Sequence, residues 1–332
     1  MSRGALVAIV LALALSGAVL APRAAAAQAQ KVARIGVLSP FSQADGPAPS
    51  FHVFRDSLRE LGHVEGEDLA FEYRWADGKY DRLPALAAEL AQSKVDVLVS
   101  AWSTPAALAA KRAAPSTPIV FVGVGDAVGV GLVGSLARPG GNVTGSTFLS
   151  EETVGKLLQL LKEVVPRASR VATVFNPGNP VYVPMLKDVD AMGRQLKLKV
   201  VRLGIQGPGD VEAVFDSARR ERLDGLVVMR DFVLITYRER IVELAAKHRL
   251  PVMYGMREFV AAGGLMSFEP SLPELYHRAA GLVHKILKGA RPAELPIEQS
   301  SRFELVINMK TAKALGLTIP SPVLVRADQV IE

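Results

Sequence analysis

The stretch VDVLVSAWSTPAALAAKRAAPSTPIVFVGVGD, from Val95 to Asp126, shows how the chain is built. A short β-branched run from Val95 to Ser100 is followed by an alanine-rich segment that begins at Pro105, and a second apolar run begins at Ile119. Short apolar runs between turn residues are typical of buried strands, and proline is common at the first position of a helix. The pattern therefore predicts a strand, a crossover helix and a second, parallel strand.

The same alternation continues outward from this stretch in both directions. A first series has predicted strands near 34–38, 69–73, 95–100, 119–122 and 143–145, with helices near 50–61, 80–92 and 105–113. A second series has predicted strands near 170–175, 199–203, 225–228, 251–254 and 264–267, with helices near 151–164, 181–197, 209–220 and 234–249. Alternating strands and helices form parallel sheets covered on both faces. We therefore predict an α/β fold with two doubly wound parallel-sheet lobes.

The join between the two series, near residues 145–150, is short and lacks a flexible Gly/Ser linker, so we expect the lobes to lie close together. A tail with a helix pattern at 272–288, a strand pattern at 303–308 and a helix pattern at 309–315 follows the second series. Such a tail suggests that the chain crosses between the lobes more than once, which would form a hinge. We expect an N-terminal lobe of residues 30–146 plus about 270–296, and a C-terminal lobe of 147–269 plus about 297–332.

The first 29 residues have the three parts of a secretory signal peptide. A positively charged start precedes an uncharged apolar run from Ala5 to Ala21, and Ala27-Gln28-Ala29 offers a cleavage site before Gln30, with cleavage before Gln28 as an alternative. The apolar run approaches the ~17-residue lower limit for a membrane-spanning helix, but Pro22 and the alanines after it favour cleavage. We expect an exported, periplasmic mature protein that is not inserted in the membrane.

The composition excludes several functional classes. The absence of cysteine excludes disulfides, thiol catalysis and Cys-ligated zinc. The net charge of +6, which falls to +4 without the signal peptide, is spread along the chain, so we expect no nucleic-acid partner. The five histidines lack a metal-binding spacing, and the sequence motifs of P-loop proteins, α/β-hydrolases, zinc proteases and dinucleotide-binding enzymes are absent. We expect no cofactor, no metal and no enzymatic activity.

The residues that directly follow the strands are the candidates for ligand binding, because ligands bind beyond the carboxyl ends of the strands in open parallel sheets. The candidates are Ser39, Trp102, Ser103, Thr104, Asp126, Asn176, Asp231 and Tyr254. Ser103 and Thr104 precede Pro105 and can cap a helix, whose free N–H groups also attract a carboxylate. Trp102 can contact the ligand or pack in the core.

The two aspartates among the candidates each have two interpretations. Asp126 can cap a helix over residues 128–136, or it can bind an ammonium or hydroxyl group in a closed cleft. Asp231 can pair with Arg230 at the surface, or it can bind the same ligand groups.

The remaining candidates also allow a purely structural role. Asn176, with Asn179, flanks a Pro-Gly turn, and turn formation alone would explain both asparagines. The hydroxyl of Tyr254 can face the cleft, or the ring can simply pack in the core.

Five blocks of sequence resemble one family. They are RIGVLSP (34–40), the long block from Phe54 to Leu90, SLARPGGNVTG (135–145), YGMREFVAAGGLMSF (254–268) and FELVINMKTAKALGLTIP (303–320). These blocks resemble the ABC-transporter substrate-binding family that includes tryptophan- and phenylalanine-type binding proteins. The resemblance spans nearly all of the mature chain. It implies a type I periplasmic-binding-protein fold, a small-molecule solute in the cleft, and an ABC permease with its cytoplasmic ATPase as the partner.

The expected mechanism is capture of a small solute by closure of the two lobes, with amino acids as the ligands of characterised family members. The helix start at Ser103 holds a carboxylate, Asp126 or Asp231 takes a cationic or hydroxyl group, and Trp102 and Tyr254 flank the body of the ligand. The main alternative is a periplasmic sensor that presents its closed form to a chemoreceptor or histidine kinase. A hydrolase or isomerase on the same scaffold has no supporting motif.

Overall fold

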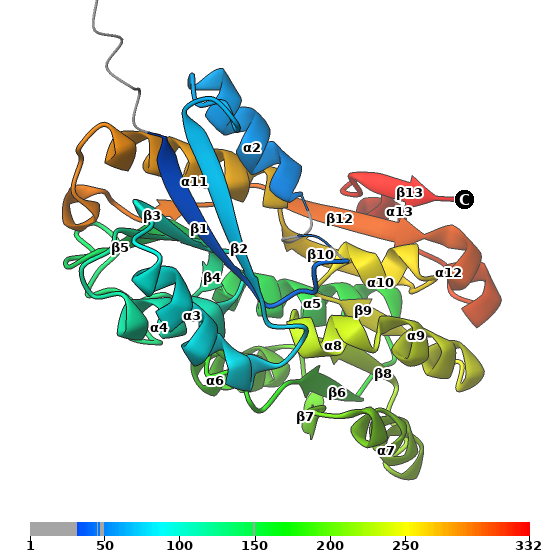
Figure 1. The fold of residues 1–332 in the computed structure, drawn as a ribbon. Coiled ribbons are helices and arrows are strands. Elements are labelled where there is room, and N and C mark those ends of the chain that lie inside the picture. Colours follow the sequence, from blue (N-terminus) through cyan, green and yellow to red (C-terminus); the bar gives the residue numbers. More distant parts are fainter. Residues whose placement is uncertain (1–31, 45, 47–49, 149) are drawn as a thin grey trace, which may run out of the picture. The chain divides into compact units, whose positions relative to one another are not determined.

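Two mainly parallel sheets, each covered by helices, organise the chain (Figure 1). The first sheet has the strand order β11-β5-β4-β3-β1-β2, and the second has the order β13-β12-β10-β9-β8-β6-β7. The paired strands of the described residues run parallel, except that β10 and β12 are antiparallel. The predicted α/β fold with two parallel-sheet lobes is therefore confirmed.

The structure is a computed structural model that describes residues 32–44, 46, 50–148 and 150–332. Residues Ala33–Glu332 belong to one compact unit. The predicted signal peptide, residues 1–29, lies outside the described residues. In the described part of the chain, no helix has both the length and the apolar character that crossing a bilayer requires.

The first lobe contains the first sheet and its helices. In chain order it holds β1 (Ala33–Ser39), α2 (Phe51–Glu60), β2 (Leu69–Trp75), the 3₁₀ helix η1 (Tyr80–Arg82), α3 (Leu83–Gln92), β3 (Val97–Ser100), α4 (Thr104–Ala113), β4 (Ile119–Gly125) and β5 (Val143–Phe148). Between β4 and β5, residues 128–136 form turns, so the helix that the sequence predicted there is wrong. Gly129, Gly131 and Gly134 explain the error, because glycine disfavours a helix interior.

The second lobe repeats the strand order of the first. It holds α5 (Ser150–Val164), β6 (Arg170–Phe175), α6 (Tyr182–Gln195), β7 (Lys199–Gly204), α7 (Pro208–Arg220), β8 (Gly225–Val228), α8 (Phe232–Thr236), α9 (Arg238–Lys247), β9 (Val252–Tyr254), α10 (Arg257–Ala261) and β10 (Met266–Pro270). The order β7-β6-β8-β9-β10 corresponds to β2-β1-β3-β4-β5 in the first sheet. The helix predicted over 234–249 is divided into α8 and α9 at Tyr237.

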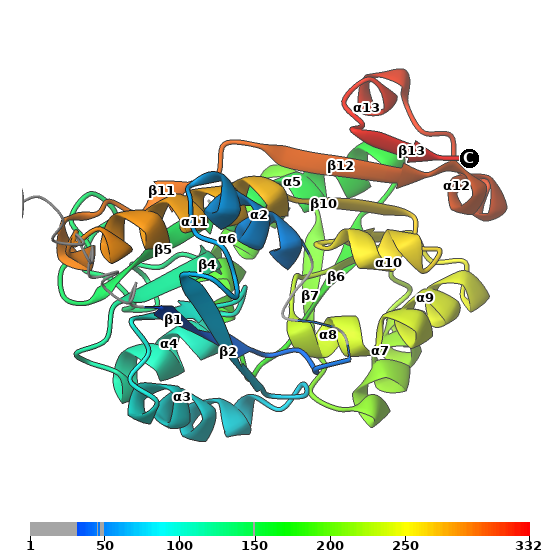
Figure 2. The same ribbon diagram turned by 45° about the horizontal axis from the view of Figure 1, so that its top comes forward.

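The tail of the chain returns to the first lobe and then to the second. It comprises α11 (Leu272–Leu287), η2 (Pro292–Glu294), β11 (Glu298–Gln299), β12 (Phe303–Asn308), α12 (Met309–Leu315), α13 (Ser321–Leu324) and β13 (Gln329–Ile331). Helix α11 packs on α2, β4 and β5, and β11 pairs with β5, whereas β12 pairs with β10. The chain therefore passes between the sheets after β5, after β10 and after β11, and the last two segments run alongside each other (Figure 2).

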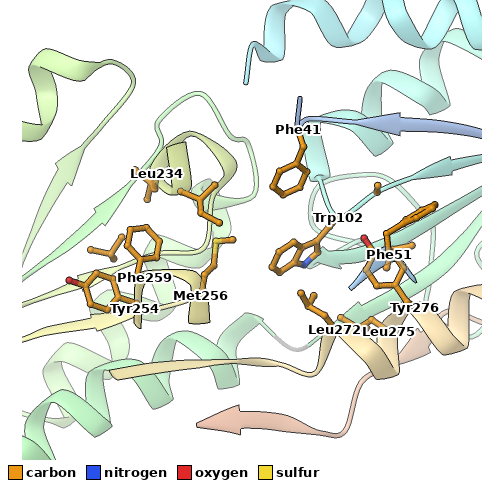
Figure 3. Packing of buried hydrophobic residues seen from close by; sticks show 14 of the residues in the cluster. Phe41, Phe51, Trp102, Leu234, Tyr254, Met256, Phe259, Leu272, Leu275 and Tyr276 are labelled. Carbon is orange, nitrogen blue, oxygen red and sulfur yellow. The ribbon is translucent and has the colours of Figure 1, made fainter. Parts of the chain in front are cut away.

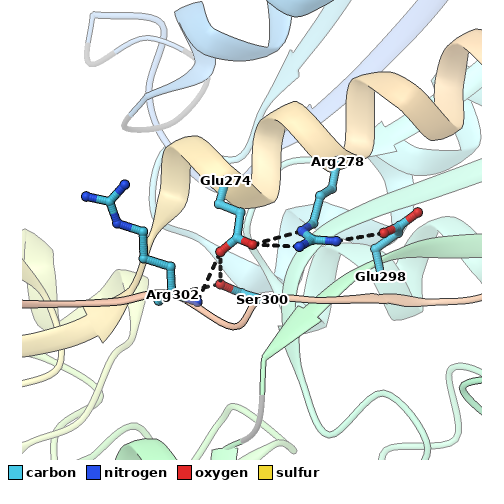
Figure 4. A network of polar contacts seen from close by, with 5 residues as sticks. All are labelled: Glu274, Arg278, Glu298, Ser300 and Arg302. Carbon is cyan, nitrogen blue, oxygen red and sulfur yellow. Dashed lines mark hydrogen bonds and ion pairs between the residues drawn. The ribbon is translucent and has the colours of Figure 1, made fainter.

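A polar network holds these two neighbouring segments together (Figure 4). Glu274 Oε2 accepts hydrogen bonds from Ser300 Oγ at 2.7 Å and from the backbone N–H of Arg302 at 3.2 Å. Its Oε1 accepts from Arg278 Nη2 at 2.7 Å, and Arg278 Nη1 also donates to Glu298 at 2.9 Å. Glu274 and Arg278 belong to α11, whereas Glu298, Ser300 and Arg302 belong to the segment that returns to β12. The network therefore joins the start of α11 to this returning segment.

Successive residues of a strand are buried on opposite faces of the sheet, as the pleat of a strand requires. In β1, Ile35 and Leu38 belong to different apolar clusters. In β9, Val252 and Tyr254 join one cluster and Met253 joins another. Complete burial of an aliphatic side chain of this size contributes about 1.5–3 kcal/mol to folding. The burial of several such side chains therefore fixes which face of each strand packs against which helix layer.

Candidate functional site

A cavity lies between the two lobes, at the carboxyl ends of their parallel strands. The first lobe contributes Phe41, Tyr80, Trp102, Ser103, Thr104, Gly123, Gly125 and Phe148. The second lobe contributes Thr153, Val154, Leu157, Asn179, Val181, Tyr182, Met185, Met229, Arg230, Asp231, Phe232, Gly255 and Met256. The position of the cavity agrees with the rule for open α/β sheets. Most of the lining is aromatic or aliphatic, so the cavity suits an apolar ligand body.

The cavity is nearly closed by the side chains that line it. The cavity and its mouth together enclose about 680 Å³ outside the protein atoms, but only about 50 Å³ of this is interior space. Such an interior holds a few water molecules and is too small for an amino acid with a large side chain. The lobes are therefore in a closed arrangement, from which a ligand-sized space arises only when they separate or when lining side chains move.

Arg230, directly after β8, reaches across the cleft into the first lobe. Its guanidinium lies 4.6 Å from the ring centre of Trp102 and 4.1 Å from that of Phe148, and its Nη2 donates to the carbonyl of Gly123 at 2.9 Å. Burial lowers the pKa of Arg230 to about 10, against the opposite effect of neighbouring Glu269. The buried Nη1 has no hydrogen-bond partner among the described residues, so it can donate to an acceptor on a ligand.

Asp231 carries the opposite charge next to Arg230 in the sequence and is held by four donors. Asn179 Nδ2 donates to it at 2.8 Å, Asn176 Nδ2 at 3.0 Å and the backbone N–H of Val233 at 2.8 Å. The fourth donor, Tyr80 Oη, belongs to the first lobe and lies 3.4 Å away. Burial raises the pKa of Asp231 above its ordinary value, although the asparagine hydrogen bonds oppose this shift. The carboxylate is positioned to receive a cationic group.

Trp102 lies on the opposite wall, between β3 and α4, with its side chain facing the cavity near Phe41 (Figure 3). Its φ of 51° is uncommon for a residue with a large side chain, and the indole Nε1 is buried without a described partner. The ring lies against Gly123, where an added Cβ would come within 2.4 Å of Trp102 Cδ1. Gly123, with φ 63°, is therefore required for this packing.

Ser103 and Thr104 line the same wall at the start of α4. Ser103 is the N-cap, and its Oγ accepts from the backbone N–H of Ala106 at 3.2 Å. The predicted capping role is thus present, and both side chains also border the cavity. Of the eight sequence candidates, four line the cavity: Trp102, Ser103, Thr104 and Asp231.

The other four candidates lie outside the lining. Ser39 is fully buried, and its Oγ accepts from the backbone N–H of Phe41 at 3.1 Å. Asp126 closes a turn by accepting from Gly129 N–H at 2.8 Å. Asn176 stands behind the wall, where it orients the carboxylate of Asp231. The observed contacts of these three residues are structural.

Tyr254 also lies outside this cavity. Its ring stacks on Phe259 with the ring centres 4.7 Å apart, and its hydroxyl points away from Trp102 (Figure 3). The alternation along β9 explains this direction, because Tyr254 shares the face of Val252.

Four aromatic or charged side chains of the lining were not among the sequence candidates: Tyr80, Phe148, Tyr182 and Arg230. One of the two interpretations of Asp231 paired it with Arg230 at the surface, whereas Arg230 contacts the first lobe. The position of Arg230 after a strand is a signal that could have identified it. No group of three or more His, Cys, Asp or Glu side chains in the described ranges is arranged to hold a metal ion.

The two lobes, the parallel strand order and the closed cavity between them define a bilobal solute-binding protein. The chain belongs to the ABC transporter substrate binding protein family, whose model matches residues 35–331. It is therefore a solute-binding protein of an ABC transporter, a class that is not enzymatic.

Three relatives place the chain within this family. A tyrosine-binding protein of Clostridioides difficile is 27% identical over 265 residues, which cover 80% of this chain and 75% of that protein. A Streptococcus pneumoniae ABC domain solved in complex with L-Trp is 25% identical with a TM-score of 0.81, over 90% of this chain and 99% of that one. The ligand-free, open structure of a Clostridium difficile substrate binding protein with adhesive properties is also 25% identical over 90% of this chain and 99% of that one, but its TM-score is 0.65. The better fit to the L-Trp complex agrees with the contacts across the cleft.

Proposed function

We propose that this chain is the extracytoplasmic receptor of an ABC importer and that it captures an amino acid with an aromatic side chain by closure of the two lobes. The observation that carries this proposal is the pairing, in one mainly apolar cavity, of an arginine with a free donor and a buried carboxylate, Arg230 and Asp231. A free amino acid has the complementary charges, a carboxylate and an ammonium, on one carbon atom. Trp102, Phe148 and Tyr182 supply the aromatic surface for its side chain.

The family relatives support the same ligand class. Of the three relatives, one is a tyrosine-binding protein and one was solved in complex with L-Trp. The signal-peptide pattern in the first 29 residues supports export to the periplasm, and family membership supports a permease as the partner. Closure requires that the ligand has a higher affinity for the closed arrangement than for the open one. Contacts to both Trp102 and Asp231, which belong to different lobes, meet that requirement.

The test is calorimetric titration of the mature protein, starting at Gln30, with the twenty amino acids. We expect the tightest binding for tryptophan, tyrosine or phenylalanine. For the best ligand, tryptamine-type analogues without the carboxylate and propionate-type analogues without the amine should each bind about 100-fold more weakly, because each leaves a buried charge unpaired.

Two variants assign the two charges. Arg230→Gln should reduce the preference for the amino acid over its amine analogue, and Asp231→Asn should reduce the preference over its deaminated analogue. Arg240→Gln, an exposed arginine on α9 outside the cavity, is the control and should keep both preferences. Equal affinity for the amino acid and both analogues would contradict the proposal.

A further inference from the structure

A second cavity lies wholly inside the second lobe, between α9, β9, α12 and the loop that precedes β10. Its volume is about 360 Å³, compared with about 50 Å³ for the interior of the cleft cavity. Apolar walls come from Val242, Leu250 and Leu265, and from Leu315 on α12. A cavity of this size lies within the range of small-molecule sites, about 300–1,000 Å³. The cavity does not depend on lobe closure, because one lobe supplies all of its walls.

Tyr254 on β9 contributes an aromatic wall to this cavity. Tyr254 lines the cavity and is only 1% exposed. Its ring lies against Gly264, where an added Cβ would come within 2.6 Å of Tyr254 Cε2. The residues next in the chain, Gly255 and Met256, line the cleft instead.

Two cations stand at the exposed edge of the cavity. Arg249 follows α9, and Lys310 lies in the first turn of α12. Both residues are exposed, and neither forms an ion pair with a described carboxylate. Arg249 donates only a long hydrogen bond, 3.4 Å, to the carbonyl of Ala314. A pair of cations without a carboxylate partner at an apolar opening favours an anionic ligand head group.

We propose that this cavity is a second small-molecule site, which binds a monocarboxylate with an apolar body. Arg249 and Lys310 receive the carboxylate, and the aliphatic walls together with the ring of Tyr254 hold the apolar chain. The site is separate from the cleft and needs no movement of the lobes. Ligand binding here is independent of the solute that the cleft takes.

The test uses ¹⁹F NMR of the mature protein labelled with 3-fluorotyrosine and titrated with sodium octanoate. The chain has six tyrosines, so the signal that disappears in Tyr254→Phe belongs to Tyr254. We expect octanoate to shift this signal in a saturable way and to leave the signals of the cleft residues Tyr80 and Tyr182 in place. Octylamine, which has the same chain and the opposite charge, should not shift it.

Charge-matched variants locate the carboxylate. Arg249→Gln with Lys310→Gln should weaken octanoate binding about tenfold or more. Lys247→Gln with Lys313→Gln removes the same number of charges from α9 and α12 at exposed positions outside the cavity, and should leave binding unchanged. Ala314→Trp at the exposed edge should abolish binding by filling the opening.

Three results would overturn the proposal. They are the absence of any shift of the Tyr254 signal, equal binding of octanoate and octylamine, and an equal loss of binding in the two charge-matched double variants. Retained octanoate binding in Ala314→Trp would have the same consequence. Because Ala314 and the four charged positions are exposed, each variant is expected to fold, which circular dichroism and thermal unfolding can check.

Discussion

The two cavities of this protein differ in how their walls are built. The cleft cavity takes walls from both lobes, and its interior of about 50 Å³ is crossed by Arg230 and bordered by Tyr80 and Trp102. The cavity behind β9 takes its walls from one lobe and keeps about 360 Å³. A site shared by two lobes changes its volume when the lobes move, and its ligand therefore shifts the equilibrium between open and closed forms. A site within one lobe keeps its volume when the lobes move, so its ligand need not shift this equilibrium.

The largest expected effect comes from removing the aromatic wall of the cleft. Trp102→Ala should reduce affinity for the cleft ligand at least 100-fold and lower the free energy of unfolding by about 3–5 kcal/mol, because it removes a large buried ring and the contact with Arg230. Calorimetric titration and urea unfolding measure the two effects. Trp75→Ala, on the edge strand β2 and outside both cavities, is the control and should keep cleft affinity.

The glycine that supports this wall should be nearly as sensitive. Gly123→Ala brings a Cβ within 2.4 Å of Trp102 at a φ of 63°, so we expect a loss of about 2–4 kcal/mol in the free energy of unfolding. Gly281→Ala in α11, where an added Cβ meets nothing within 4 Å, should instead stabilise the protein by about 0.5–1 kcal/mol. Urea unfolding compares them, and equal stability of the two variants would show that Trp102 can move aside.

Glu269, in the second lobe near Arg230, makes stability depend on pH. Burial, reinforced by neighbouring Glu258, raises the pKa of Glu269 to about 8 from an ordinary value of 4.5. The folded protein therefore binds this proton more tightly than the unfolded chain does. The resulting stability is complete below about pH 4.5 and is lost as the pH rises towards 8.

Glu269→Gln should remove this slope. Between about pH 5 and 8, the free energy of unfolding of the natural protein should fall by about 3 kcal/mol more than that of the variant. Urea unfolding at several pH values measures the difference. Parallel pH profiles for the two proteins would mean that Glu269 ionises normally. Glu304→Gln, a carboxylate on the neighbouring strand β12 that pairs with Arg257, serves as the control.

The smallest effect concerns one aromatic contact across the cleft. Phe41 and Phe232 meet edge to face with ring centres 4.6 Å apart, whereas Phe268 and Phe303 stack at 5.2 Å inside the second lobe. In double-mutant cycles to alanine, the first pair should show a coupling of about 0.5–1.5 kcal/mol in the free energy of cleft-ligand binding. The second pair should show coupling in unfolding only. Coupling in binding for the pair within one lobe would break the distinction between the cavities.

The order of strands and helices could be predicted from the sequence because burial fixes the pattern of each strand. Short strands that exist only because they pair with a distant strand could not be predicted. Strands β11 and β13 are two and three residues long and are defined by pairing with β5 and β12. The expected return to the second lobe near residue 297 falls slightly later, because β11 keeps Glu298 and Gln299 in the first sheet.

Only those residues of the candidate site that directly follow a strand could be predicted from the sequence. Position after a strand led to Trp102 and Asp231, which line the cleft, but also to Asp126, whose side chain turns back to its own loop. For Tyr254, the alternation that puts it on the same face as Val252 was readable and indicated a direction away from the cleft. Arg230 also follows a strand, but its reach across the cleft could not be predicted, because it depends on rings more than 80 positions away in the chain.

The repeated passage of the chain between the sheets has a consequence for how this protein folds. The first sheet has its last strand, β11, at residues 298–299, and its covering helix α11 comes after the whole second sheet core from β6 to β10. During synthesis, the first lobe is thus begun first but cannot be completed until β6 to β10 of the second lobe have been made. The loop between β5 and its partner β11 spans about 150 residues, and closing a loop of that length is slow. The second lobe can assemble β6 to β10 in the meantime, and the folded second lobe shortens the distance over which α11 and β11 must then find the first.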